Sequence, residues 1–306
     1  MARHFLRRFL LTLPAIWLVL TMVFLLIHIV PGDPVEQMLG EGAAPGQVTQ
    51  LRHSLGLDQP LYIQYARYLG QIVRGDLGQS FKFQASVRHV IFERYPATLQ
   101  LALLALLVCA AIAIPAGVLA ADRRGSNSDR AIGVLTLIGL AVPNFALGPL
   151  LITLFSIKLG WLPVSGRGGG LNYILPAVTL GAALAAILTR MVRGSMLEEL
   201  SSDYVRTARA KGLSNTAVLV RHALRNALIP IITILGLQFG TLLAGTIVTE
   251  TIFSWPGIGR LTVMAISSRD YPLLQGCILV IALSYVLVNL LTDMLYAFID
   301  PRVRLS

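Results

Sequence analysis

The amino-acid sequence predicts an all-α integral membrane protein with six transmembrane helices. Of the 306 residues, 55% are hydrophobic and 13% are charged, and the mean hydropathy of +0.72 exceeds what a soluble domain can expose without aggregating. Six apolar runs are long enough to span, since a helix needs roughly 20 residues to cross a bilayer. Backbone groups inside a bilayer must bond within their own segment, so each run is expected to be helical. The runs are residues 9–30, 97–121, 133–157, 173–192, 228–250 and 275–299.

The first run, within residues 1–30, follows Arg3, Arg7 and Arg8, as the apolar region of a cleaved signal peptide would. The run is too long for a signal peptide, and no small-residue cleavage pattern follows it. We therefore expect a retained N-terminal tail and first span, with the three arginines in the cytoplasm. Six spans then also place the C-terminal tail, residues 300–306, in the cytoplasm.

Residues 31–96 are expected outside the membrane, in the periplasm. Apolar residues from Val48 to Ile72 recur near helical spacing, which indicates amphipathic helices joined by turns. Acidic and basic residues balance in this segment. It could pack as a lid on the ends of the membrane helices, meet a substrate-delivering protein, or do both.

Residues 97–299 form the predicted membrane core, which contains a cytoplasmic loop at 193–227 and a periplasmic loop at 251–274. The orientation follows from the distribution of basic residues, because the external loop 158–172 carries only Lys158 and Arg167. Within the third run, a Pro-Asn pair at residues 143–144 predicts a kink, which could serve as a gate or as a packing bend.

The fifth run carries polar and small residues that suit the wall of a translocation path. Polar groups in hydrocarbon are costly, so they are expected to face the bundle interior or a water-filled path. Three are predicted to line the path, and three glycines accompany them: Gln238, Thr241 and Thr246, with Gly236, Gly240 and Gly245. For Asn289 and Asp293 in the last run, hydrogen bonding between helices is the alternative.

A turn is predicted directly after the fifth run, at Phe253, Trp255, Pro256 and Gly257. The proline and the glycine force a change of direction, and the two aromatic rings suit the interfacial belt of a membrane. The turn could close the outer mouth of the path as a periplasmic gate. A lipid anchor would explain the aromatic residues equally well.

The polar segment at residues 202–230 is predicted to be a docking loop for another protein. Ala208 and Gly212 share one helical face, so this face offers a small-residue surface that a partner can approach closely. Gly212 can end one helix in a left-handed conformation, and Ser214 can cap the next. We therefore expect two short helices joined at a glycine.

Five stretches of the chain resemble, in order and spacing, the inner-membrane permeases of ABC importers, above all the branch for dipeptides, oligopeptides, nickel and glutathione. The stretches are residues 31–34, 207–213, 221–227, 253–260 and 269–272. The resemblance extends over essentially the whole chain. One departure concerns the Glu-Ala-Ala with which the general loop pattern begins, since Arg206, Thr207 and Ala208 stand there. Members of this branch commonly show the same departure.

The resemblance implies a type I ABC importer permease in the bacterial inner membrane, the transmembrane subunit of an ATP-driven peptide importer. Besides membrane lipid, its partners would be a second homologous permease, two ATPase subunits and a periplasmic substrate-binding protein. ATP would close the ATPase pair, and the docked loops would swing the helices from an inward-open to an outward-open state. The residues implied to couple this chain to the ATPases are Tyr204, Thr207, Ala208, Lys211, Gly212 and Leu213.

The chain itself is not expected to be an enzyme. Its three lysines follow Phe, Ile and Ala, so the chain contains no Gly-Lys-Ser/Thr phosphate loop. ATP and Mg²⁺ would be bound by the partner ATPases. No cofactor or metal site is expected here, because the histidines form no cluster and both cysteines, Cys109 and Cys277, fall inside spans. The net charge of +10 lies mainly on the cytoplasmic side, as membrane insertion requires, so nucleic-acid binding is not expected.

Dipeptides, glutathione or related small peptides are the expected substrates, because a chain of this length with a short first external segment resembles those members of the branch. A nickel-chelate or oligopeptide permease is the alternative within the family. A secondary transporter would usually show an internal repeat, and none relates residues 1–150 to residues 151–306. A membrane scaffold or insertase would leave the two-helix loop unexplained.

Overall fold

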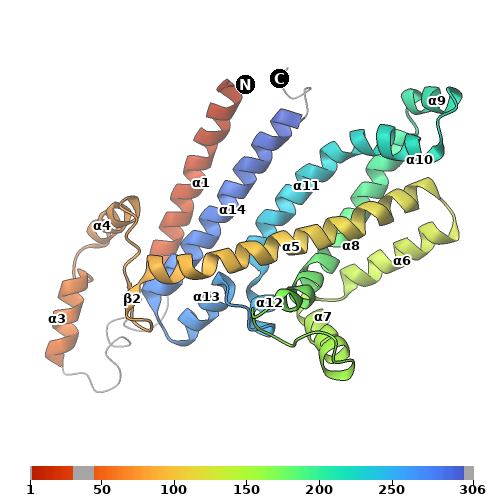
Figure 1. Cartoon of the computed structure of the whole chain (residues 1–306). Coiled ribbons are helices and arrows are strands. Elements are labelled where there is room, and N and C mark those ends of the chain that lie inside the picture. Colours follow the sequence, from red (N-terminus) through yellow and green to blue (C-terminus); the bar gives the residue numbers. More distant parts are fainter. Residues whose placement is uncertain (1, 30–44, 300–306) are drawn as a thin grey trace. The chain divides into compact units, whose positions relative to one another are not determined.

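The computed structural model describes residues 2–29 and 45–299, most of which are helical (Figure 1). The motif at 31–34 and the tail at 300–306 lie outside the described residues. The first elements are α1 (Ala2–Ile29), α3 (Pro45–Leu55), α4 (Leu61–Val73), β1 (Gln79–Ser80), β2 (Ala85–Ser86), α5 (Val87–Asp122), α6 (Asn127–Ala141), α7 (Asn144–Leu151) and the π-helical turn η1 (Ile152–Lys158). The later elements are the 3₁₀ turn η2 (Gly170–Tyr173), α8 (Ile174–Leu200), α9 (Asp203–Ala210), α10 (Asn215–Ala217), the π-helical turn η3 (Val218–Ala223), α11 (Leu224–Gly245), α12 (Ile247–Ile252), α13 (Ile258–Ser267) and α14 (Tyr271–Ile299).

The chain divides into two compact units. One consists of Leu99–Trp255 together with the end of α14 from Leu287, and the other of Ala2–Thr98 together with Pro256–Val286. The long helices α5 and α14 contribute residues to both.

Each of the six predicted runs contains helix within the described residues, but not every one of these helices is long enough for a straight span. Within the described part of the chain, four helices are long and apolar enough to cross a membrane: Val87–Asp122, Gly170–Leu200, Asn215–Leu243 and Tyr271–Leu295. A fifth crossing is possible if α6 and the segment Asn144–Lys158, bent by 102°, form one broken span. The apolar part of α1, Leu10–Leu25, is shorter. The count of six crossings therefore remains a prediction.

The predicted interruption of the third run is confirmed, and it is a sharp break. Val142 leaves the helix with a ψ of 115°, and Pro143 stands before α7 with a φ of −66° and a ψ of 143°. Proline disfavours the helical conformation of the residue before it and has no N–H to continue the helix, which accounts for the break.

The helix of the second predicted run, α5, begins at Val87, ten residues before its predicted start at residue 97. Charged residues such as Glu93 and Arg94 conceal this extension in the sequence. In the structure, Val87, Val90 and Ile91 are buried against apolar residues of α13 and of the first part of α14. The helix therefore extends beyond its apolar run because one of its faces is covered by protein.

In the unit that contains Leu99–Trp255, α5, α8, η3 and α11 form a continuous apolar core around Leu188, Val192 and Met196. Glycines allow the helices to approach closely. A Cβ at Gly117 would lie 2.6 Å from the side chain of Val192, and one at Gly181 would lie 2.6 Å from the backbone oxygen of Ala105. Small residues at such contacts are typical of membrane helix packing.

Candidate functional site

The loop between α8 and α11 has the predicted form of two short helices joined at a glycine. Gly212 has a φ of +78°, and the amide of Leu213 donates to the carbonyl oxygen of Ala208 at 3.3 Å, as expected for a left-handed helix end. Ser214 accepts a hydrogen bond from the amide of Ala217 at 3.4 Å and so caps α10. Both local predictions are confirmed.

The second helix of the loop does not stop before the membrane. It runs through α10, η3 and α11 as one helical segment, Asn215–Leu243. On the other side, Ser201 and Ser202 separate α8 from α9. The loop thus lies directly on the ends of α8 and α11 (Figure 1).

The expectation that Ala208 lies on the outward face is wrong. Ala208 is 6% exposed, and it is buried together with Val205 and Val218, with Leu200 packed against them. The reason is that α9 folds back onto η3, so its small-residue face forms the interior of the loop. Gly212 is exposed, and a Cβ placed there would meet no atom of the described chain within 4 Å.

Four of the other predicted coupling residues form the outward surface of the loop. Tyr204 is 38% exposed and Leu213 is 42% exposed, while Thr207 and Lys211 are also exposed. The Tyr204 hydroxyl donates to the Glu199 carboxylate. Partial burial, together with this hydrogen bond, raises the pKa of Tyr204, so the phenol stays neutral at physiological pH. The surface combines two apolar side chains with the Lys211 cation.

The predicted path residues have different environments. Gln238 is 7% exposed, its Oε1 accepts from the Cys109 thiol at 3.5 Å, and its Nε2 has no hydrogen-bond partner in the described chain. Thr246 is buried and donates to Glu250 Oε1 at 3.1 Å. Thr241 is exposed, and its hydroxyl donates to the carbonyl oxygen of Leu237 at 2.8 Å.

Gly236 of α11 lies at a contact between helices. A Cβ at Gly236 would lie 2.4 Å from the hydroxyl oxygen of Thr292 on α14, so Gly236 permits close helix packing. This contact argues against the expected place for Gly236 in a translocation wall.

The expectation of interfacial aromatic residues at the turn after α12 is wrong. Trp255 is 0% exposed and Phe253 is also buried, so neither ring can anchor in lipid from this conformation. The Trp255 ring meets Tyr173 edge to face with centroids 4.8 Å apart. The turn itself is present: Ser254 has a φ of 50°, Pro256 follows Trp255, and the extended Gly257 precedes α13.

Sequence reasoning missed two polar contacts. Asp129 at the start of α6 forms an ion pair with Arg193 of α8, 64 residues away. Asp270 receives hydrogen bonds from the β1–β2 hairpin, including one from Ser80 at 2.5 Å. The spacing of Ser126 and Asp129, three residues apart before an apolar run, was a local signal for a helix cap at Ser126. The distant partners had no local signal.

These features define a class of multi-spanning membrane proteins in which a folded polar loop is joined directly to two membrane helices. Within this class, a family model described as the binding-protein-dependent transport system inner membrane component matches residues 113–305, and the corresponding N-terminal model matches residues 1–102. The chain belongs to this family, the inner-membrane permease components of ABC importers, and is a multi-pass inner-membrane protein.

Relatives of similar length support the same assignment. The chain is 44% identical over 304 residues to the glutathione transport system permease protein GsiC of Escherichia coli strain K12, with 99% of each chain covered. It is 46% identical over 327 aligned positions to the di/tripeptide transport system permease protein DppB of Pseudomonas aeruginosa strain UCBPP-PA14, with 97% of each covered. The fold is similar to that of a chain of the inward-facing methionine ABC transporter MetNI, with a TM-score of 0.59 at 17% identity, covering 69% of this chain and 96% of that one.

Proposed function

We propose that this chain is the transmembrane subunit of an ATP-driven importer of dipeptides, glutathione or related small peptides. It pairs with a second, similar permease, and the substrate path runs between the two. A periplasmic binding protein delivers substrate, and separate ATPase subunits bind ATP and Mg²⁺. The termini and the loop at residues 202–230 face the cytoplasm.

The form of the loop is the observation that carries the coupling role. Tyr204, Thr207, Lys211 and Leu213 are exposed on its outward side, and the space beside Gly212 is open. A partner can therefore approach the backbone at Gly212 closely. Because the loop has its own buried core and continues directly into α11, a movement imposed on it would be passed to the membrane helices.

The peptide class is supported by the two relatives, whose names give glutathione and di/tripeptides as their substrates. For the path, Thr241 offers an exposed hydroxyl on α11, and the Nε2 of Gln238, which has no partner among the described residues, would find one in a water-filled channel. The path is thus expected along the Gln238 and Thr241 part of α11.

The test is uptake by proteoliposomes that contain the whole complex, isolated through a tag on this chain. Radiolabelled glutathione and the dipeptide Ala-Ala are offered with the binding protein, with ATP inside, with ADP inside, or with an imposed proton gradient. We expect uptake of at least one probe with ATP alone. Uptake driven by the proton gradient without ATP would contradict the proposal and favour a secondary transporter.

A further inference from the structure

Asp122 and Asp129 flank the turn between α5 and α6, residues 123–126, and they are bonded to the docking loop and to α8, the helix before it. On one side, Arg193 of α8 binds Asp129 of α6 with two parallel hydrogen bonds, Nε to Oδ1 at 2.7 Å and Nη2 to Oδ2 at 2.8 Å. On the other side, Asn215 of α10 donates through Nδ2 to Oδ1 of Asp122, the last residue of α5, at 2.9 Å. Neither α5 nor α6 contributes residues to the docking loop itself.

Asp129 is held in place from several directions. Its Oδ2 also accepts from the amide of Gly125 at 2.9 Å, and its own amide donates to Ser126, the cap of α6. Its side chain is 11% exposed, whereas that of Arg193 is 36% exposed. Bidentate pairs of this kind fix orientation as well as distance. The carboxylate therefore holds together three parts of the chain: the turn, the start of α6, and the last part of α8.

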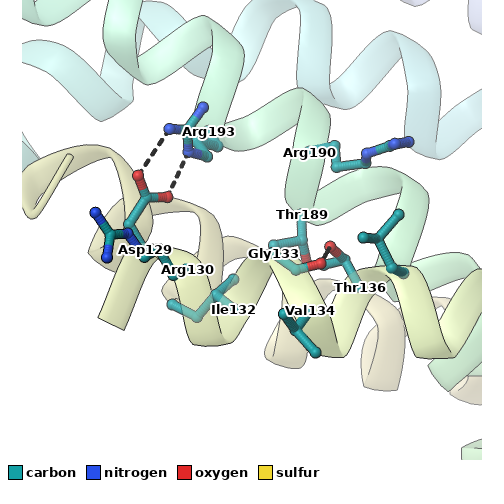
Figure 2. Close-up of a pocket in the computed structure, with 10 residues that line it drawn as sticks. Asp129, Arg130, Ile132, Gly133, Val134, Thr136, Thr189, Arg190 and Arg193 are labelled. Atoms are coloured by element: carbon teal, nitrogen blue, oxygen red, sulfur yellow. Dashed lines mark hydrogen bonds and ion pairs between the residues drawn. The ribbon is translucent and has the colours of Figure 1, made fainter. Parts of the chain in front are cut away.

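Arg130 and Arg190 line the same cavity as this pair and form no comparable contact with the described residues. A cavity of about 520 Å³ between α6 and α8 is lined by Asp129, Arg193, Arg130 and Arg190, among others. Figure 2 shows Arg193 directed at Asp129, while Arg190, on the same helix, extends away from it. No hydrogen bond or ion pair joins the Arg190 side chain to the described residues. Arg190 is thus a matched control for Arg193.

Apolar packing continues the same connection. Ala121 near the end of α5 belongs to the buried core that contains Met196 of α8 and Leu219 of η3. The ends of α5, α8 and the second loop helix are therefore packed together where the polar contacts lie.

We propose that Asp129 and Arg193 are positioning residues that make α5 and α6 follow the movement of the docking loop. The inference rests on the proposed function, because the movement is the one that the ATPases impose. The pair transmits movement to two helices that contribute no residue to the docking loop. Asp129 and Arg193 touch neither substrate nor nucleotide in this role.

The test is hydrogen exchange measured by mass spectrometry on the intact complex, with and without ATP and orthovanadate. In the wild type, nucleotide should change exchange both in residues 203–217 of the docking loop and in residues 123–135, the turn with the first part of α6. In Asp129→Asn and in Arg193→Gln, the loop should still respond, while the response of the turn falls at least about threefold. Asp129→Asn retains an oxygen that can accept from the Gly125 amide. Arg193→Gln leaves the hydrogen bonds of Asp129 to Gly125 and Ser126 intact. An effect that both variants share therefore comes from the loss of the ion pair.

Two controls make the outcome decisive. Arg193→Lys keeps the charge without the bidentate geometry and should give an intermediate response, and Arg190→Gln should match the wild type. A full response of the turn in Asp129→Asn and Arg193→Gln, or an equal loss in Arg190→Gln, would overturn the positioning role. A docking loop that does not respond to nucleotide in the wild type would instead contradict the proposed function.

Discussion

Two neighbouring positions of the docking loop have opposite environments, although both carry small residues. Ala208 is small because it packs inside the loop against Val205 and Val218. Gly212 has open space beside it. Glycine is favoured at this position because of the backbone, since a φ of +78° is unfavourable for residues with a Cβ. A bulky residue at Ala208 is thus expected to disrupt the loop, whereas one at Gly212 both strains the turn and obstructs a partner.

Gly212→Leu should lower the amount of ATPase that copurifies with the chain. The left-handed conformation costs a bulky residue roughly 1–2 kcal/mol, which corresponds to a loss of about 5- to 30-fold in the population of the native turn. The measurement is quantitative mass spectrometry of the tagged complex. Gly194→Leu is the matched control, because Gly194 is exposed within α8, has no positive φ, and has equally open space around it. Equal copurification from the two variants would contradict the docking role of Gly212.

Gln238→Leu should reduce uptake while the amount of assembled complex and its ATP hydrolysis stay nearly unchanged. The side-chain volume is similar, and the amide nitrogen that is removed has no partner in the described chain, so little stability is lost. Uptake is measured in proteoliposomes at saturating ATP. A wild-type rate would return Gln238 to a packing role beside Cys109.

At the scale of elements, the sequence predicts best what depends on local chemistry. The left-handed Gly212, the cap at Ser214 and the break at Pro143 each depend on the conformational preference of one or two residues. The burial of Ala208 and Trp255 could not be predicted in this way, because it depends on which element folds over them. The same is true of Asp129 and Arg193, which meet only after α6 and α8 pack together.

The start of α14 shows another contact that depends on tertiary structure. Asp270 is 1% exposed and caps the helix through a hydrogen bond from the Leu273 amide to Oδ1 at 3.2 Å. Its other oxygen accepts from Ser80 at 2.5 Å and from the Lys82 amide at 3.1 Å. One carboxylate thus joins the β1–β2 hairpin to the last long helix.

Asp270→Ala should destabilise this arrangement. Loss of an acidic helix cap costs about 0.5–2 kcal/mol, so the midpoint of thermal unfolding in detergent should fall by roughly 2–5 °C. Asp203→Ala is the control, because the Asp203 side chain in the first turn of α9 is 95% exposed. An unchanged midpoint in Asp270→Ala would show that the hairpin is held by other contacts.

At the scale of the whole molecule, the apolar runs predict where helices lie better than how each one crosses the membrane. An apolar run shows only that a segment is suited to lipid or to the protein interior. It does not reveal that the chain bends by 102° between α6 and the segment Asn144–Lys158, or that α5 begins at Val87, where it is buried against α13. The orientation rests on the distribution of arginine and lysine and remains a prediction.

Cysteine labelling in intact cells tests that orientation. Ser214→Cys should resist a membrane-impermeant maleimide, because the docking loop is expected in the cytoplasm, whereas Gln47→Cys should react. Both positions are exposed, and the native Cys109 and Cys277 are buried, which keeps the background low. Labelling of Ser214→Cys from outside would reverse the orientation.

The central claim is that the exposed face of the docking loop binds a separate ATPase. The most direct measurement places the photo-crosslinking residue p-benzoylphenylalanine at Lys211 in living cells and identifies the captured protein by mass spectrometry. A control chain carries the same crosslinking residue at the exposed Lys158, which begins the predicted external loop 158–172. We predict that position 211 captures a protein with a Gly-Lys-Ser/Thr phosphate loop and that position 158 does not. Capture of such an ATPase from position 158, or its absence at position 211 in a complex active in transport, would contradict the claim.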